Sequence, residues 1–97
     1  MEEAEKAKLE GNAHFKAGKL NKAVGAFTRA IELASHPEKS YHSNRSAVLC
    51  KLRRLEEALA DAEICIELDP TWHKGYIRRG DVQMGLEDFD AALASFQ

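Results

Sequence analysis

The sequence predicts an all-α solenoid built from stacked helical hairpins, and three observations support this fold class. The first is an internal repeat with a period of 34 to 35 residues in a chain of 97. The second is that each repeat holds two segments of about 12–15 residues with apolar side chains at helical spacing. The third is that no segment shows the alternating pattern of a strand. In such a fold each hairpin packs mainly on its neighbours.

The repeat becomes visible when its small residues are aligned. Gly11, Ser46 and Gly80 are separated by 35 and then 34 residues. The same offsets superpose several further sets, including Leu20 with Leu55 and Phe89, Ala23 with Ala58 and Ala92, and Phe27 with Ala62 and Phe96. Small residues at the Gly11 and Ala23 positions would let two helix backbones approach closely, while larger residues fill the space between neighbouring hairpins.

Six helices are expected in order along the chain, near residues 3–17, 20–34, 38–51, 54–68, 72–85 and 88–97. The hairpin turns fall at Gly18-Lys19, Arg53-Arg54 and Glu87-Asp88. Between the repeats, Pro37 and Pro70 end the preceding helix, because proline cannot continue a helix and disfavours helical geometry in the residue before it. Gly25 would lie inside the second helix, where glycine costs about 1 kcal/mol relative to alanine.

We expect one domain over residues 1–97, with repeat 1 at about 4–37, repeat 2 at about 38–72 and a partial repeat 3 at about 73–97. The third repeat is truncated, which gives about 2.5 repeats in all. Its last helix carries an apolar stripe of Phe89, Leu93 and Phe96, without the following helix that would normally cover it. Two explanations remain: the chain is a piece of a longer protein, or a second copy covers the stripe.

Composition and motifs argue against several classes of function. A net charge of −2 does not suit a nucleic-acid-binding domain. The charged first residues differ from a secretory signal, and no run approaches the roughly 18 apolar residues of a membrane span, so a cytoplasmic protein that does not enter membranes is expected. Cys50 and Cys65 have no metal or redox spacing, and we expect reduced, mostly buried thiols and no metal or other cofactor. Since no catalytic motif is present, we expect no enzyme activity.

The first helix of each hairpin should line the concave side of the solenoid, so its inward stripe is the candidate binding surface. Helical spacings of 3, 4 and 7 select Lys8, Asn12, Phe15 and Lys16 on the first helix, Ser43, Asn44, Ala47 and Lys51 on the third, and Lys74, Ile77, Arg78 and Asp81 on the fifth. Acids gather instead between Arg54 and Pro70, on the predicted acidic back: Glu56, Glu57, Asp61, Glu63, Glu67 and Asp69. A basic, amide-bearing concavity suits a carboxylate ligand, which needs several donors at once. Taken singly, each lysine could equally be a solvated surface residue.

The period and the pattern of small and large residues resemble the tetratricopeptide (TPR) repeat over nearly the whole chain. The resemblance is closest to the dicarboxylate-clamp TPR domains of co-chaperones, in particular the first TPR domain of the heat-shock organising protein (Hop) family. The residues that carry it are Lys8-Leu9-Glu10-Gly11-Asn12, Asn44-Arg45-Ser46 and Lys74-Gly75-Tyr76-Ile77-Arg78. They match the family patterns Lys-x-x-Gly-Asn, Asn-Arg-Ser/Ala and Lys-x-x-x-Arg.

This resemblance implies a protein-interaction module that binds the C-terminal Glu-Glu-Val-Asp tail of cytosolic heat-shock chaperones of the seventy- or ninety-kilodalton class. It implies that five residues form the carboxylate clamp: Lys8, Asn12, Asn44, Lys74 and Arg78. Phe15, Lys51 and Ile77 are candidates for additional contacts with the peptide. Two alternatives stay open. The chain could be a structural scaffold that self-associates through its uncovered C-terminal hairpin or binds another partner, or the targeting domain of a larger phosphatase, prolyl isomerase or ubiquitin ligase.

Overall fold

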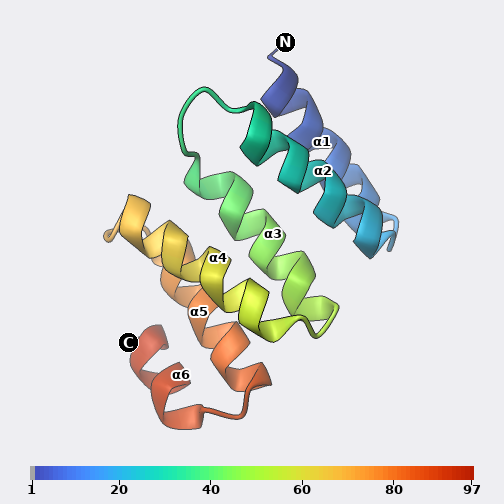
Figure 1. Cartoon of the computed structure of the whole chain (residues 1–97). Helices are drawn as coiled ribbons and strands as arrows, with labels where there is room; N and C mark the ends of the chain where they lie inside the picture. Colours follow the sequence, from blue (N-terminus) through green and yellow to red (C-terminus); the bar gives the residue numbers. More distant parts are fainter. Residues whose placement is uncertain (1) are drawn as a thin grey trace.

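Six α-helices make up most of the chain in a computed structural model, which describes residues 2–97 (Figure 1). They are α1 (Glu3–Lys16), α2 (Leu20–Leu33), α3 (Lys39–Lys51), α4 (Leu55–Leu68), α5 (His73–Gly85) and α6 (Phe89–Phe96). Their ends lie within about one residue of the bounds expected from periodicity, and no strand occurs in this part of the chain. The predicted all-α class and the order of the helices are therefore confirmed.

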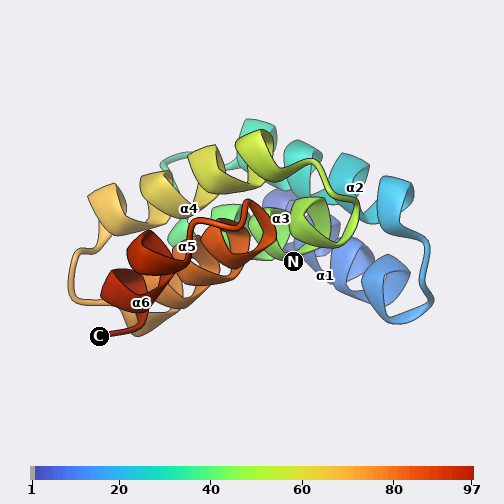
Figure 2. The same cartoon turned by 90° about the horizontal axis from the view of Figure 1, so that it is seen from below.

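The helices form three antiparallel hairpins, α1/α2, α3/α4 and α5/α6, stacked into a curved body of 41 × 27 × 17 Å. Each hairpin contacts the next one, and α3 also contacts both α1 and α5. Figure 2 shows α2 and α4 along the outer side of the arc and α1, α3 and α5 along its inner side. We call this second side the inner face. It is the side on which the sequence placed the candidate binding stripe.

Each hairpin turns at a residue with a positive φ angle, at equivalent positions in the three repeats: Gly18 (77°), Arg53 (62°) and Glu87 (62°). In the first turn the Lys19 amide donates to the His14 carbonyl at 2.8 Å and the Gly18 amide to the Phe15 carbonyl at 3.0 Å. The same pair of bonds recurs in the other two turns, so all three helices end in a Schellman motif. Only the first turn uses glycine, the residue that adopts this conformation without steric cost.

The core contains close approaches between helices where the repeat places glycine. A Cβ atom on Gly11 would lie 2.6 Å from Cε1 of Phe27, and one on Gly80 would lie 2.3 Å from Cε1 of Phe96. Phe27 is completely buried and packs with Ala23 and Val48. The prediction that small residues at these positions let paired helices approach closely is confirmed.

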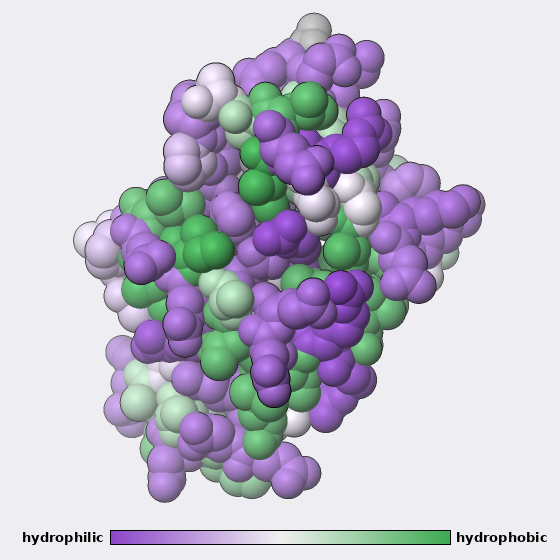
Figure 3. Space-filling model, in the orientation of Figure 1, coloured by the Kyte–Doolittle hydropathy of each residue, from purple (hydrophilic) through white to green (hydrophobic). Residues whose placement is uncertain are grey.

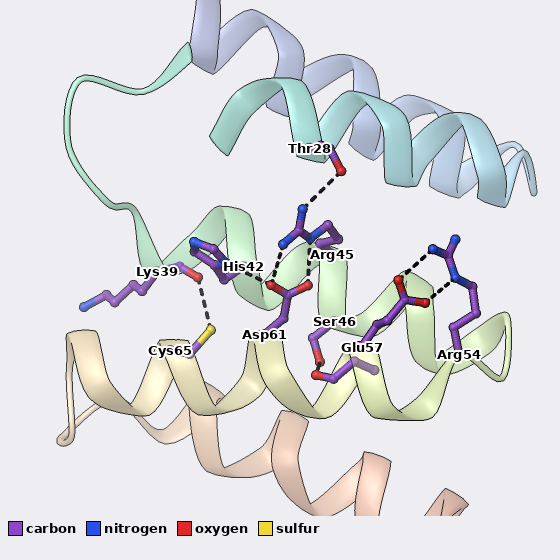
Figure 4. Close-up of polar contacts among 10 residues, drawn as sticks. Thr28, Lys39, His42, Arg45, Ser46, Arg54, Glu57, Asp61 and Cys65 are labelled. Carbon is purple, nitrogen blue, oxygen red and sulfur yellow. Dashed lines mark hydrogen bonds and ion pairs between the residues drawn. The ribbon is translucent and has the colours of Figure 1, made fainter. Parts of the chain in front are cut away.

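The acidic back predicted for the second helices is wrong at Asp61, which is only 2% exposed. Its carboxylate accepts hydrogen bonds from Arg45 Nε at 2.7 Å and Arg45 Nη2 at 2.8 Å, and it lies 2.9 Å from Nδ1 of His42 (Figure 4). Arg45 also donates to Oγ1 of Thr28 at 3.1 Å. A buried charged network thus joins α2, α3 and α4.

Asp69, another of the acids predicted on the back, is also paired. Its carboxylate accepts from Nζ of Lys39, which ties the end of α4 to the start of α3. Hydrogen bonds from Lys39 and then from Thr71 lower the pKa of Asp69 to about 2. The outer side therefore carries fewer unpaired carboxylates than a count of acids along the sequence indicates.

Both cysteines are free thiols, as expected. Cys65 is completely buried, its thiol donates to the Lys39 carbonyl at 3.3 Å, and burial raises its pKa to about 11 (Figure 4). Cys50 is half-buried, and burial likewise raises the pKa of its thiol. Neither thiol is activated toward nucleophilic chemistry, because the thiolate is the reactive form.

On the face drawn in Figure 3, hydrophobic residues lie in patches among hydrophilic ones. On α6, the side chains of Phe89, Leu93 and Phe96 are 58%, 59% and 48% exposed, so the predicted uncovered stripe is confirmed. None of the helices in residues 2–97 has the length and apolar character needed to cross a bilayer. The stripe is thus a local apolar surface at the end of the stack.

Candidate functional site

The inner face brings together helices that carry every candidate site residue. Lys8, Asn12 and Phe15 lie on α1, Asn44 and Lys51 on α3, and Lys74, Ile77 and Arg78 on α5. Two hydrogen bonds join these helices. Nδ2 of Asn44 donates to Oδ1 of Asn12 at 3.5 Å, and Nε of Arg78 donates to Oγ of Ser43 at 3.1 Å. The first links α3 to α1 and the second links α5 to α3, so the two bonds together bridge three hairpins. We call Asn12, Asn44, Ser43 and Arg78 the polar row.

Lys8 is held in position by an acid one turn earlier. Its Nζ lies 2.7 Å from Oε1 of Glu5, whose Oε2 accepts from the Tyr41 hydroxyl at 3.0 Å. The hydrogen bonds from Lys8 and Tyr41 lower the pKa of Glu5, while burial and the bond to Glu5 raise the pKa of Tyr41 to about 12. An ammonium group has three donors. Since this ion pair engages one of them, Lys8 keeps donors for a ligand in a fixed place.

Lys74 differs from Lys8 because its side chain is free. It is exposed and makes no hydrogen bond or ion pair with any other residue between 2 and 97. Arg78 lies one helical turn further along α5, about 5–6 Å away at the Cβ atoms, on the same face of the helix. Like charges at this spacing repel each other modestly. An anion placed between them would relieve that repulsion.

A hollow of about 350 Å³ opens on the inner face beside Arg78, and we call it the Phe15 hollow. Its lining residues are Phe15, Ser46, Ala47, Cys50, Lys51, Arg78 and Asp81. The hollow brings three of the predicted site residues together, namely Phe15, Lys51 and Arg78. Phe15, Ala47 and Cys50 supply apolar atoms, while two cations and one carboxylate leave the lining with a net positive charge. Such a hollow can accept an aliphatic side chain beside an anionic group.

Ile77 does not line the Phe15 hollow. It is 44% exposed and lines a second hollow of about 460 Å³ between α5 and α6, together with Tyr76 and Phe96. Among the candidate residues, Ile77 is therefore the one whose surroundings separate it from the polar row of the inner face.

The arrangement offers several hydrogen-bond donors on the inner face. Amide and cationic side chains come from α1, α3 and α5, the three helices of the inner face. The described residues contain no cluster of three or more His, Cys, Asp or Glu side chains that could hold a metal. Several fixed donors on one surface suit a ligand with two carboxylates, because charge-assisted hydrogen bonds are strong and each carboxylate accepts more than one.

Two residues of the site received no role from the sequence. Ser43 lies on the predicted stripe, but nothing in its type shows that it pairs with Arg78, which is 35 positions away. Glu5 has a local signal that could have found it, since it precedes Lys8 by three residues and oppositely charged side chains at this spacing pair on a helix.

Sequence comparison identifies curated proteins that are similar to nearly the whole chain. No family model matches the chain. The heat shock protein STI1 of Saccharomyces cerevisiae is 40% identical over 94 residues, which cover 97% of this chain and 16% of that protein. The Hsp70-Hsp90 organizing protein of Triticum aestivum is 47% identical over 94 residues, covering 97% and 16%. The chain therefore spans about a sixth of the length of these curated relatives.

Solved structures share the fold closely. The Arabidopsis OM64 TPR domain has a TM-score of 0.92 and 34% identity, covering 98% of this chain and 78% of that one. The TPR2B domain of yeast Sti1, solved as a complex with pHsp70, has a TM-score of 0.90 and 36% identity, covering 96% and 74%. The second TPR domain of Spaghetti (RPAP3), bound to the HSP90 peptide SRMEEVD, has a TM-score of 0.89 and 31% identity, covering 97% and 86%.

Proposed function

The chain belongs to the family of TPR domains represented in STI1 and the Hsp70-Hsp90 organizing proteins, and on this premise we propose that it is a co-chaperone module that binds the acidic C-terminal tail of Hsp70 or Hsp90 chaperones. The proposed ligand is a free chain end that reads Glu-Glu-Val-Asp. Such an end carries two neighbouring carboxylates, one on the main chain and one on the last side chain. The proposal concerns this domain, since the relatives are about six times longer.

The observation that carries the proposal is the row of donors across the inner face. In our proposal the clamp consists of Lys8, Asn12, Asn44, Lys74 and Arg78. The Asn44–Asn12 and Arg78–Ser43 hydrogen bonds support it, because they bring donors from three separate hairpins to one surface. The solved TPR domains of yeast Sti1 and RPAP3, which share this fold, are complexes with pHsp70 and with an HSP90 peptide that ends in EEVD.

The remaining predicted contacts follow from the Phe15 hollow. We propose that an aliphatic side chain of the peptide packs on Phe15 and that Lys51 pairs with an acidic or hydroxyl group upstream of the chain end. The apolar and cationic lining of the hollow supports this assignment. Ile77 stays a prediction as a further contact. It would require the peptide to extend beyond the polar row.

The expected affinity is moderate. A hydrogen bond to a charged group contributes about 1.5–3 kcal/mol, but ordering a flexible tail offsets much of the sum. A micromolar dissociation constant, near −8 kcal/mol, is the reasonable expectation. Because the attraction is largely between charges at the surface, affinity should fall as ionic strength rises.

Calorimetry with two matched peptides tests the function. A free-acid peptide of about eight residues ending in Glu-Glu-Val-Asp should bind with micromolar affinity, and the same peptide with an amidated end should not bind, since amidation removes one of the two carboxylates. Equal affinity for both peptides would show that the terminal carboxylate is not the anchor. Peptides with the upstream sequence of each chaperone class would then show which class is preferred.

We also propose that the module acts by binding and not by catalysis, and that it works in the cytoplasm. The donor-rich inner face supports the first statement, and neither thiol has a lowered pKa. The similarity to STI1 and the Hsp70-Hsp90 organizing proteins supports the second.

Self-association is a second candidate, favoured by the exposure of Phe89, Leu93 and Phe96 on α6. Light scattering distinguishes the two candidates. A dimer whose population rises with concentration and that ignores acidic peptides would favour self-association, and a monomer that binds them would favour the clamp.

A further inference from the structure

Ser43 occupies an unusual place for a serine in this molecule. It lies on α3 directly before Asn44, it is completely buried, and its hydroxyl oxygen accepts a hydrogen bond from Nε of Arg78 at 3.1 Å. Arg78 belongs to α5, in the next hairpin. The contact therefore fixes a charged group of one hairpin against a buried polar atom of another.

This bond selects which edge of the guanidinium is left for a ligand. The group carries five N–H donors in one plane, one on Nε and four on the two terminal nitrogens. Ser43 occupies the Nε donor, and neither terminal nitrogen of Arg78 forms a hydrogen bond within the part of the chain that the structure describes. The edge formed by Nη1 and Nη2 is therefore the free one, and it can meet a carboxylate with two parallel hydrogen bonds.

We propose that Ser43 is a positioning residue for ligand binding: its buried hydroxyl holds Arg78 by Nε, so that the Nη1–Nη2 edge faces the carboxylate of the ligand. This inference rests on the proposed function, since it assigns how one member of the clamp is oriented. Without the hydroxyl, the arginine side chain would sample other rotamers in the free protein. Ordering it would then become part of the cost of binding.

The chain contains a matched control for this contact. Nε of Arg79 donates to Oγ of Ser95 at 3.0 Å, and Ser95 is 4% exposed. Both contacts join Nε of an arginine to the hydroxyl of a buried serine at about the same distance, and the two arginines are neighbours on α5. Arg79 and Ser95, however, line the hollow between α5 and α6 and not the Phe15 hollow. Ser95→Ala thus removes the same kind of bond away from the inner face, together with a bond that the Ser95 hydroxyl donates to Oε1 of Gln83 at 2.6 Å.

The first measurement is the affinity of the free-acid Glu-Glu-Val-Asp peptide by calorimetry. Ser43→Ala should weaken binding about threefold to tenfold, in line with one hydrogen bond to a charged group partly offset by solvent, and Ser95→Ala should leave it unchanged. Thermal unfolding of each variant checks that the fold is kept. Unchanged affinity in a folded Ser43→Ala variant would overturn the inference.

A double-mutant cycle separates positioning from a general structural effect. Arg78→Lys keeps a cation but has no counterpart of Nε–H, so adding Ser43→Ala to it should cause no further loss of affinity. An equal loss in both backgrounds would show that the hydroxyl does not act through Arg78, and would overturn the inference.

The free protein gives a readout that does not depend on the peptide. In NMR spectra the Arg78 Nε–H signal should be protected from solvent exchange, and Ser43→Ala should remove that protection while the Arg79 signal is retained. If the native domain fails to bind the peptide, the proposed function is wrong, and this signal still tests the pairing. Absence of protection at Arg78 Nε–H in the native domain would overturn the inference whatever the peptide does.

Discussion

Gly11 lies against the ring of Phe27 so closely that a Cβ atom on Gly11 would be 2.6 Å from Cε1 of the ring. Gly80 and Phe96 repeat the relationship in the third hairpin. In the middle hairpin the repeat register places Ser46 and Ala62 at these positions, and both are completely buried. In the first and third hairpins glycine on one helix thus faces phenylalanine on its partner, and in the middle hairpin two small residues occupy the equivalent positions.

Gly11→Ala should destabilise the domain. The new methyl group would overlap a ring that is completely buried and packed against Ala23 and Val48, so the helices must separate or the ring must leave its rotamer. Overpacking of this kind costs about 1–3 kcal/mol, which exceeds the gain in helix propensity. Urea denaturation should show a lower midpoint. An unchanged midpoint would mean that the hairpin adjusts freely.

Gly25→Ala should have the opposite effect. Gly25 is exposed inside α2, and a Cβ atom there would meet nothing within 4 Å. Alanine should therefore raise the free energy of unfolding by about 1 kcal/mol through helix propensity alone. The same denaturation experiment measures it. Because the substitution is identical to that at Gly11, a loss of stability here would contradict the packing explanation for both.

Glu87→Gly should stabilise the third turn. Glu87 has a φ angle of 62° and is exposed, so the residue bears the cost of a left-handed conformation, and its side chain forms no hydrogen bond or ion pair in residues 2–97 that would offset it. Replacing it with glycine should raise stability by roughly 0.5–1 kcal/mol after the entropy cost of glycine is included. Gly18→Ala, at the equivalent position of the first turn, is the converse control and should lower stability. If Glu87→Gly and Gly18→Ala changed the stability of the domain in the same direction, this explanation would be contradicted.

Asp61→Asn should lower the free energy of unfolding by about 3 kcal/mol, because it leaves the guanidinium of Arg45 partly buried without its counter-charge. Burial opposes ionisation of Asp61, but the hydrogen bonds from Arg45 and His42 outweigh it and hold its pKa below the usual 3.8. Glu63→Gln is the control, since Glu63 is exposed on the same helix.

The carboxylates of Asp61 and Asp69 make the stability of the fold depend on pH in the acid range. A carboxyl group whose pKa is lower in the folded state stabilises the fold above its unfolded pKa, and this contribution is lost as the pH falls through the folded pKa. Asp61 has a lowered pKa and Asp69 one of about 2, so stability should be level above about pH 5 and should fall from about pH 4 toward pH 2. Asp61→Asn should make this fall shallower. Denaturation midpoints measured at a series of pH values check both statements.

Lys74→Ala and Arg78→Ala should each remove most of the affinity for the acidic peptide. Lys74 is exposed and makes no ion pair within residues 2–97, so its loss should leave the fold intact. Lys22→Ala is the control, because it removes the same charge from an exposed position on α2. Calorimetry measures the affinities, and circular dichroism checks the fold. Unchanged affinity in the Lys74 and Arg78 variants would remove the clamp from consideration.

The fold could be predicted from the sequence because its signals are local and repeated. Periodicity, the prolines and Gly18 fix where helices begin and end, and the repeat then gives the register of the hairpins. The left-handed turns at Arg53 and Glu87 carry no sign in their own residue types, yet their alignment with Gly18 would have indicated them.

The site could be predicted only as a stripe of residues. Asp61 looked like one surface acid among several because its partners Arg45 and His42 lie 16 and 19 residues away. The same holds for Ser43 and Arg78, 35 residues apart. The Asp61 contacts depend on how the two helices of one hairpin pack, and the Arg78–Ser43 contact depends on how neighbouring hairpins tilt against each other. A single sequence records neither.

Lys8 and Arg78 stand on helices that never touch, since within residues 2–97 only α3 contacts both α1 and α5. Bending the solenoid at the two interfaces between its hairpins therefore changes the distance between Lys8 and Arg78 without disrupting any helix. A peptide bound to both residues would link α1 to α5 and would restrict this bending motion for as long as it stays bound.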